Sequence, residues 1–129
     1  MDVLRLFLHI TAATIWVGGQ LTLAALVPAL RSAGAEAPRA AARAFRRVAW
    51  PAFGVLVLTG IWNVVAVNGE ENPPSQANLG IKYALVLVSG VSAFLHERST
   101  SKRGLAVWGA VAGLSAVLAV LWGVVLAEG

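Results

Sequence analysis

Four long apolar segments dominate the chain, at residues 3–30, 48–67, 79–95 and 105–127. Each is close to the roughly 20 residues that an α-helix needs to cross about 30 Å of hydrocarbon. The segments do not alternate in polarity as membrane β-strands do. The pattern therefore predicts an all-α, integral membrane four-helix bundle with antiparallel, up-down helices and a single domain over residues 1–129.

The composition agrees with a membrane location. Of 129 residues, 58% are hydrophobic and 12% are charged, and the mean hydropathy is +0.76. A soluble globule of this size needs more polar surface, and a disordered chain contains fewer apolar residues. Because the sequence has no cysteine, a disulfide scaffold and every thiolate metal site are excluded.

Basic residues lie asymmetrically about the four segments. Of the ten lysines and arginines, five fall in residues 31–47 and three in residues 96–104, whereas the connection after the second segment holds Glu70 and Glu71. By the positive-inside rule, loops 31–47 and 96–104 are cytoplasmic and both termini are outside. We expect a multi-pass protein of the inner (plasma) membrane whose arginines contact the lipid bilayer and not nucleic acid.

Three polar side chains are predicted at a similar depth within the spans. His9, Asn63 and Lys82 each lie a few residues from the outer end of a different helix. An imidazole, an amide and an amine thus lie roughly 4 to 9 Å below the outer surface, at about 1.5 Å per residue. Ionisable groups at this depth are costly and mark functional sites. We take these residues as the candidate ligand site, with His9 as the metal-binding residue.

Trp16 extends the candidate site along the first helix. His9, Trp16 and Gln20 share one helical face, and Gly19 beside them permits close approach of a neighbouring helix. The competing interpretation is structural, with polar residues joining helices by hydrogen bonds and Lys82 reaching the headgroups. The sequence contains no phosphate loop, HExxH motif or intramembrane carboxylate pair. Catalytic residues, and whether the protein is an enzyme, stay open.

His96 is the second histidine of the chain. The predicted topology puts it at the cytoplasmic end of the third helix, about 20 Å from His9 at 1.5 Å per residue, so one metal ion does not reach both. We interpret His96 as a cap near a helix C-terminus. Glycines on the second and fourth helices offer faces for close contact within the bundle or for a homo-oligomer. They are Gly54, Gly60, Gly109 and Gly113, of which the last two have GxxxG spacing.

Three segments carry a resemblance to a known family. They are HITAATIWVGG from His9 to Gly19, FRRVAWPAFGVLVLTGIWN, and LGIKYALVLVSGVSAFLHER with Lys82. In these segments the chain resembles the copper-resistance protein D (CopD-like) family of bacterial inner-membrane proteins. The resemblance covers nearly all of the chain. It implies a membrane module for metal (copper) handling or transport, with a copper ion or small ligand at His9, Asn63 and Lys82.

The same histidine, tryptophan, glycine and lysine pattern is similar to the HemJ-type membrane protoporphyrinogen oxidase, a haem-binding family with four helices. This similarity implies a redox or porphyrin-handling protein that binds haem b through His9. Lys82 is then the other ligand or the partner of a propionate. A third hypothesis is a cofactor-free structural subunit. Absorbance in the visible range separates the haem hypothesis from the other two.

Overall fold

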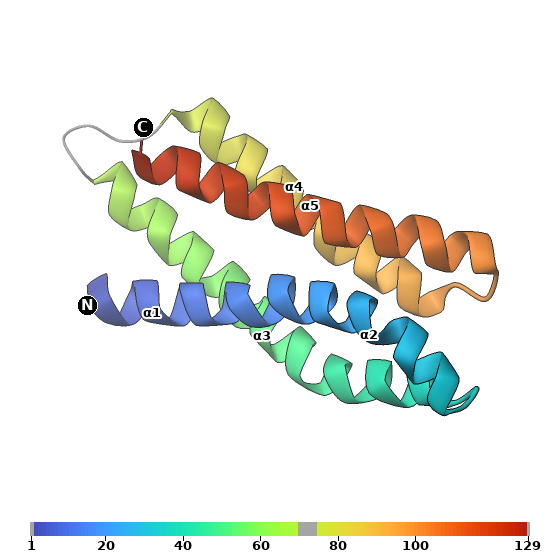
Figure 1. Ribbon diagram of the computed structural model, residues 1–129. Helices are drawn as coiled ribbons and strands as arrows, with labels where there is room; N and C mark the ends of the chain where they lie inside the picture. Colours follow the sequence, from blue (N-terminus) through green and yellow to red (C-terminus); the bar gives the residue numbers. More distant parts are fainter. Residues whose placement is uncertain (1, 70–74, 129) are drawn as a thin grey trace. The chain divides into compact units, whose positions relative to one another are not determined.

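The computed structural model describes residues 2–69 and 75–128, which are almost entirely helical (Figure 1). The elements are α1 (Asp2–Ala13), the π-helical turn η1 (Thr14–Gly18), α2 (Gly19–Ala33), α3 (Ala37–Asn68), α4 (Gln76–Arg98) and α5 (Lys102–Glu128). Since α1, η1 and α2 are continuous, the described residues form four long helices, each long and apolar enough to cross a membrane. The predicted all-α class with four membrane-length helices is confirmed.

The helices extend beyond the boundaries predicted from hydropathy. Helix α3 begins at Ala37 and not at residue 48, so most of the predicted loop 31–47 is helical. Alanine and arginine, which fill this segment, favour a helix in any solvent, whereas hydropathy detects only the part suited to hydrocarbon. Gly34 follows the end of α2 with φ 153° and ψ 158°, a conformation that is essentially restricted to glycine. The predicted acidic turn at residues 70–74 lies outside the described residues.

Backbone contacts divide the chain into two compact units, residues 1–63 and 64–129. The first unit contains α1, η1, α2 and most of α3. The second contains the end of α3 together with α4 and α5. Each unit is described by itself below.

In the first unit, α3 runs antiparallel to the helix formed by α1, η1 and α2 and crosses it (Figure 1). Their buried side chains combine the large residues Trp16 and Leu56 with the small residues Ala12, Ala49 and Ala52. Gly19 faces the ring of Phe45. A Cβ atom at Gly19 would overlap that ring. The predicted role of Gly19 in a close helix approach is therefore confirmed.

In the second unit, α4 and α5 lie side by side and antiparallel (Figure 1). Small buried side chains let the two backbones approach closely. They are Ser89 and Ser92 on α4, and Ala112, Ser115 and Ala116 on α5. The hydroxyl of Ser89 donates a hydrogen bond of 2.9 Å to the carbonyl oxygen of Ala112. The structural interpretation of the serines, as joints between helices, is confirmed for Ser89.

Large apolar side chains cover the outside of the helices. The exposed fraction is 69% for Leu58, 62% for Leu87 and 65% for Leu114. Such a surface suits hydrocarbon, because a soluble monomer rarely exposes large contiguous apolar patches. The helices and this surface together identify a multi-pass membrane protein in contact with the lipid bilayer.

Candidate functional site

The first unit brings His9 of α1 beside Thr59 of α3. The Nδ1 atom of His9 lies 2.8 Å from the hydroxyl oxygen of Thr59. Thr59 is buried, with 5% of its surface exposed, and His9 is half-buried. The two residues lie 50 positions apart in sequence, so only the folding of α3 against α1 brings them together. The contact therefore holds the imidazole in a defined place.

Arg5 lies one helical turn before His9 on α1. It is buried, with 8% of its surface exposed, and residues four apart share a helix face. The guanidinium thus adds a positive charge on the side of α1 that carries the imidazole. A buried arginine is uncommon unless it is paired or functional. Arg5 is not predicted from the sequence, where a basic residue near a helix end is unremarkable; its spacing of four residues from His9 is the signal that could have indicated it.

Trp16 lies on the same helix but is engaged in an aromatic cluster. Its ring centroid is 5.1 Å from that of Trp50 and 4.5 Å from that of Phe53, and the latter two are 5.7 Å apart. Trp16 is 3% exposed. These rings fill the space between η1 and α3, so Trp16 stabilises the unit that positions His9.

The π-helical turn η1 contains Trp16 and lies between α1 and α2. Such turns shift the side chains that follow them and are frequent at functional sites. Gln20 donates a hydrogen bond of 3.0 Å from Nε2 to the carbonyl oxygen of Trp16. Gln20 therefore bonds the backbone of its own helix, and this hydrogen bond does not join two helices as the structural interpretation expected.

Asn63 lies half-buried on α3, one turn beyond Thr59. The two residues share a face because they are four positions apart. The depth argument selected Asn63 as the partner of His9 on this helix, but the residue that hydrogen-bonds the imidazole is Thr59. A threonine hydroxyl is inconspicuous in a membrane helix, where it commonly bonds its own backbone.

Lys82 lies in the second unit, half-buried on α4. Its ammonium nitrogen is 3.5 Å from the position that a Cβ atom would occupy at Gly123 of α5. The lysine therefore lies against α5 at Gly123, at ordinary van der Waals distance. Within the described part of the chain, Lys82 has no hydrogen bond or ion pair. The approach of Lys82 to His9 stays a prediction.

His96 of α4 contacts the start of α5, across the connection between the two helices. Its Nδ1 atom donates to the carbonyl oxygen of Leu105 over 2.7 Å. Its ring covers Gly109, where a Cβ atom would come within 3.0 Å of Nδ1. The sequence predicted a cap at the C-terminal end of α4, whereas the imidazole bonds the first turn of α5 and so links the two helices across their connection. Because the His96 ring packs against Gly109, this glycine of the GxxxG pair makes a contact within the second unit.

The protein-derived ligands for a metal ion are few. Among residues 2–69 and 75–128, no group of three or more histidine, aspartate or glutamate side chains is arranged to hold a metal ion. Within these residues His9 is therefore not part of such a group, and Arg5 adds a positive charge one turn away.

One relative identifies the family of this chain. A protein of Aquifex aeolicus (strain VF5), described as an uncharacterized protein, is 32% identical over 114 residues, which cover 81% of this chain and 74% of the relative. The chain belongs to the family of this Aquifex protein. No family model matches the chain, and no solved structure matches it.

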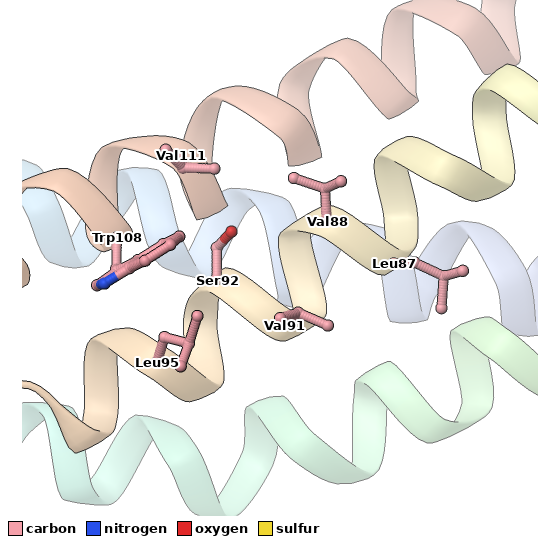
Figure 2. A pocket seen from close by; sticks show the side chains of 7 residues that line it. All are labelled: Leu87, Val88, Val91, Ser92, Leu95, Trp108 and Val111. Carbon is pink, nitrogen blue, oxygen red and sulfur yellow. The ribbon is translucent and has the colours of Figure 1, made fainter.

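This family member also has an apolar groove of about 340 Å³ in its second unit (Figure 2). Its lining comes from α4 and α5 and consists of Leu87, Val88, Val91, Ser92, Leu95, Trp108 and Val111. No side chain of the lining is titratable. The groove therefore suits an apolar chain and offers no group for catalysis or metal binding.

Proposed function

We propose that this protein is a membrane cofactor-binding protein that holds haem b through the imidazole of His9. The observation that carries the proposal is the hydrogen bond of 2.8 Å between His9 and Thr59, which fixes a half-buried imidazole in an apolar helical unit. Haem would need only one nitrogen from this site, because the porphyrin itself would supply further nitrogen ligands to the iron. Metal-binding histidines usually have their second ring nitrogen hydrogen-bonded, as His9 has.

Two cations support the proposal. Arg5 is buried one turn from His9, and a guanidinium binds carboxylates such as the propionates of haem. For Lys82, a role as the other ligand of the iron or as the partner of a propionate stays the expectation from the sequence. A half-buried lysine within a candidate span is costly without such a role.

Copper handling of the copper-resistance D type is the second candidate function. The resemblance in the segment from His9 to Gly19 and around Lys82 favours it, and imidazole is a suitable copper ligand. Copper(I) prefers sulfur, however, and the chain has no cysteine and a single methionine. A free ion also needs more protein ligands than the described residues gather at His9. Haem is therefore the better fit.

The test is an absorption spectrum of the oxidised and dithionite-reduced protein, purified in detergent from cells supplied with haem precursor and copper. Elemental analysis is made on the same sample. We expect a Soret band that is lost in His9→Ala. Stoichiometric copper without a Soret band would favour the second candidate. A sample with neither a Soret band nor copper would contradict both candidate functions and favour a cofactor-free structural subunit.

The contribution of Lys82 is tested with a matched pair. Lys82→Met and Lys102→Met each remove one lysine, the first at the half-buried position on α4 and the second at the exposed start of α5. We expect a shifted or weakened Soret band in Lys82→Met and the unchanged spectrum in Lys102→Met. Equal spectra in the two variants would remove Lys82 from the site.

For localisation we propose the inner membrane, with residues 31–47 and 96–104 in the cytoplasm. The distribution of arginines supports this orientation and favours contact with lipid over nucleic acid. Because the chain has no cysteine, single cysteines at exposed Ser32, Ser75 and Ser101 are direct reporters. We expect a membrane-impermeant maleimide to label position 75 in intact cells and positions 32 and 101 only after lysis; the reverse pattern contradicts the orientation.

For assembly we propose a homo-oligomer through glycine faces. Gly54 and Gly113 support it, since a Cβ atom at either position meets nothing within 4 Å. We expect Gly54→Leu or Gly113→Leu to lower the oligomer fraction in a cross-linking experiment. An unchanged fraction in both variants contradicts the proposal.

A further inference from the structure

We infer that Thr59 is a positioning residue that fixes the tautomer of His9, with the proton on Nδ1 and the lone pair on Nε2. This inference rests on the proposed function for its ligand and deepens it, because it defines the chemical class that the imidazole accepts. It concerns the ring itself and is measurable without any ligand.

The first step is the position of the Thr59 hydroxyl proton. The hydroxyl oxygen lies 2.7 Å from the carbonyl oxygen of Val55 and 3.2 Å from that of Leu56, both on its own helix. A carbonyl oxygen only accepts hydrogen bonds. The single hydroxyl proton of Thr59 therefore points to the backbone of α3.

The second step follows from the remaining lone pairs of that hydroxyl. With its proton committed to the helix, Thr59 can only accept from the Nδ1 atom of His9, 2.8 Å away. The proton of the neutral imidazole must then be on Nδ1. In the opposite arrangement, Thr59 donates to Nδ1 and places its oxygen against the Val55 carbonyl oxygen at 2.7 Å with no proton between them. Two acceptors in contact at a site with 5% exposure repel strongly, because little solvent screens them.

The third step is the consequence for binding. A neutral imidazole protonated on Nδ1 has its lone pair on Nε2. Such a nitrogen accepts from a metal ion or from a hydrogen-bond donor, and it does not donate to a phosphate or carboxylate oxygen. The tautomer therefore excludes an anion as the direct ligand of Nε2 and suits the metal of the proposed function, whether haem iron or a copper ion.

The ¹⁵N NMR spectrum of the histidine rings tests the tautomer in detergent micelles, at a pH where both imidazoles are neutral. The chain has two histidines, so His96→Gln assigns the signals. We expect a protonated Nδ1 on His9 in the unmodified protein and in Thr59→Ser, and a population protonated on Nε2 in Thr59→Val. Thr14→Val is the matched control, because exposed Thr14 also bonds its own helix, at Ile10, over 2.7 Å. Protonation of Nε2 in the unmodified protein, or an unchanged tautomer in Thr59→Val, overturns the inference.

Titration with hemin and with Cu²⁺ separates this inference from the proposed function. For the probe that binds, we expect Thr59→Val to raise the Kd about ten- to hundredfold, as loss of a histidine's hydrogen-bond partner does at metal sites, and Thr59→Ser to restore it. If the tautomer is as assigned and neither probe binds, the assignment stands and the proposed function fails. If Thr59→Val binds a probe as tightly as the unmodified protein, the positioning role fails and the proposed function stands.

Discussion

The two compact units differ in the side chains that join their helices. In residues 64–129, serine and alanine side chains bring α4 and α5 close together, and hydroxyl groups bond backbone carbonyls. In residues 1–63, tryptophan and phenylalanine rings fill the space between η1 and α3, and a histidine bonds a threonine across the unit. In the second unit, small side chains make the close contact between the helices. In the first unit, aromatic rings lie between the helices and a polar contact holds an imidazole.

The two histidines show the same contrast. Both engage Nδ1, but the acceptor of His96 is a backbone carbonyl nine residues away, whereas the partner of His9 is a side chain 50 residues away. The first arrangement closes a local turn. The second exists only once two distant helices have met, and it holds Nδ1 of the imidazole against Thr59.

The largest expected effect comes from removing an aromatic ring of the first unit. Trp16→Ala should lower the free energy of unfolding by about 3 kcal/mol, the lower end of the range for such substitutions, because lipid also solvates the unfolded helices. Trp108→Ala, at the half-buried edge of the open groove, should lose less than half as much. SDS titration in mixed micelles measures both. Equal losses contradict the distinction between the units.

Enlarging a small residue of the second unit should have the next largest effect. Ala112 is 2% exposed against α4, and Ala112→Leu should cost about 2 kcal/mol by overpacking. Ala110→Leu adds the same side chain at an exposed position of α5 and should be nearly neutral. The same titration measures both variants, and tolerance of Ala112→Leu would show that α4 and α5 are not closely packed.

The adjacent glycines Gly18 and Gly19 test the close contact between Gly19 and Phe45 in the first unit. Gly19→Ala should cost about 1 kcal/mol because the new Cβ displaces the ring of Phe45. At Gly18 a Cβ meets nothing within 4 Å and the backbone is helical, so Gly18→Ala should stabilise the helix by about 0.5 kcal/mol. Thermal unfolding in detergent gives the order. If Gly18→Ala is destabilised and Gly19→Ala is neutral, the assignment of the close contact to Gly19 is contradicted.

The smallest expected effect is the loss of one hydrogen bond between α4 and α5. Ser89→Ala should cost about 0.6 kcal/mol, the typical value between membrane helices. It removes only the hydroxyl that bonds Ala112. A loss above about 2 kcal/mol would mean that this bond, and not close packing, holds α4 against α5.

Hydropathy predicted four helices because polar groups are costly in lipid, so a segment that crosses the membrane must be apolar along its length. It could not predict that α3 begins at Ala37, since arginine and alanine favour a helix outside hydrocarbon as well. It also could not reveal η1, because a π turn depends on how neighbouring helices pack around Trp16 and not on a residue pattern.

The candidate site was predictable in part. The rarity of histidine within a span identified His9, whereas its depth suggested Asn63 as the neighbour on α3. Thr59 is the actual partner, one turn away, because the register between α1 and α3 is set by ring packing that no single sequence reveals. Arg5 was recognisable only by its spacing from His9.

The most direct test of the central claim is a paired measurement of stability and ligand binding in His9→Ala and His96→Ala. The account predicts that His9→Ala abolishes binding of hemin, or of Cu²⁺ if copper is the ligand, and changes the free energy of unfolding little. His96→Ala should keep that binding and lower the free energy of unfolding by about 1 kcal/mol, the worth of a hydrogen bond. Loss of binding in His96→Ala with full binding in His9→Ala would contradict the assignment of the ligand site to the first unit.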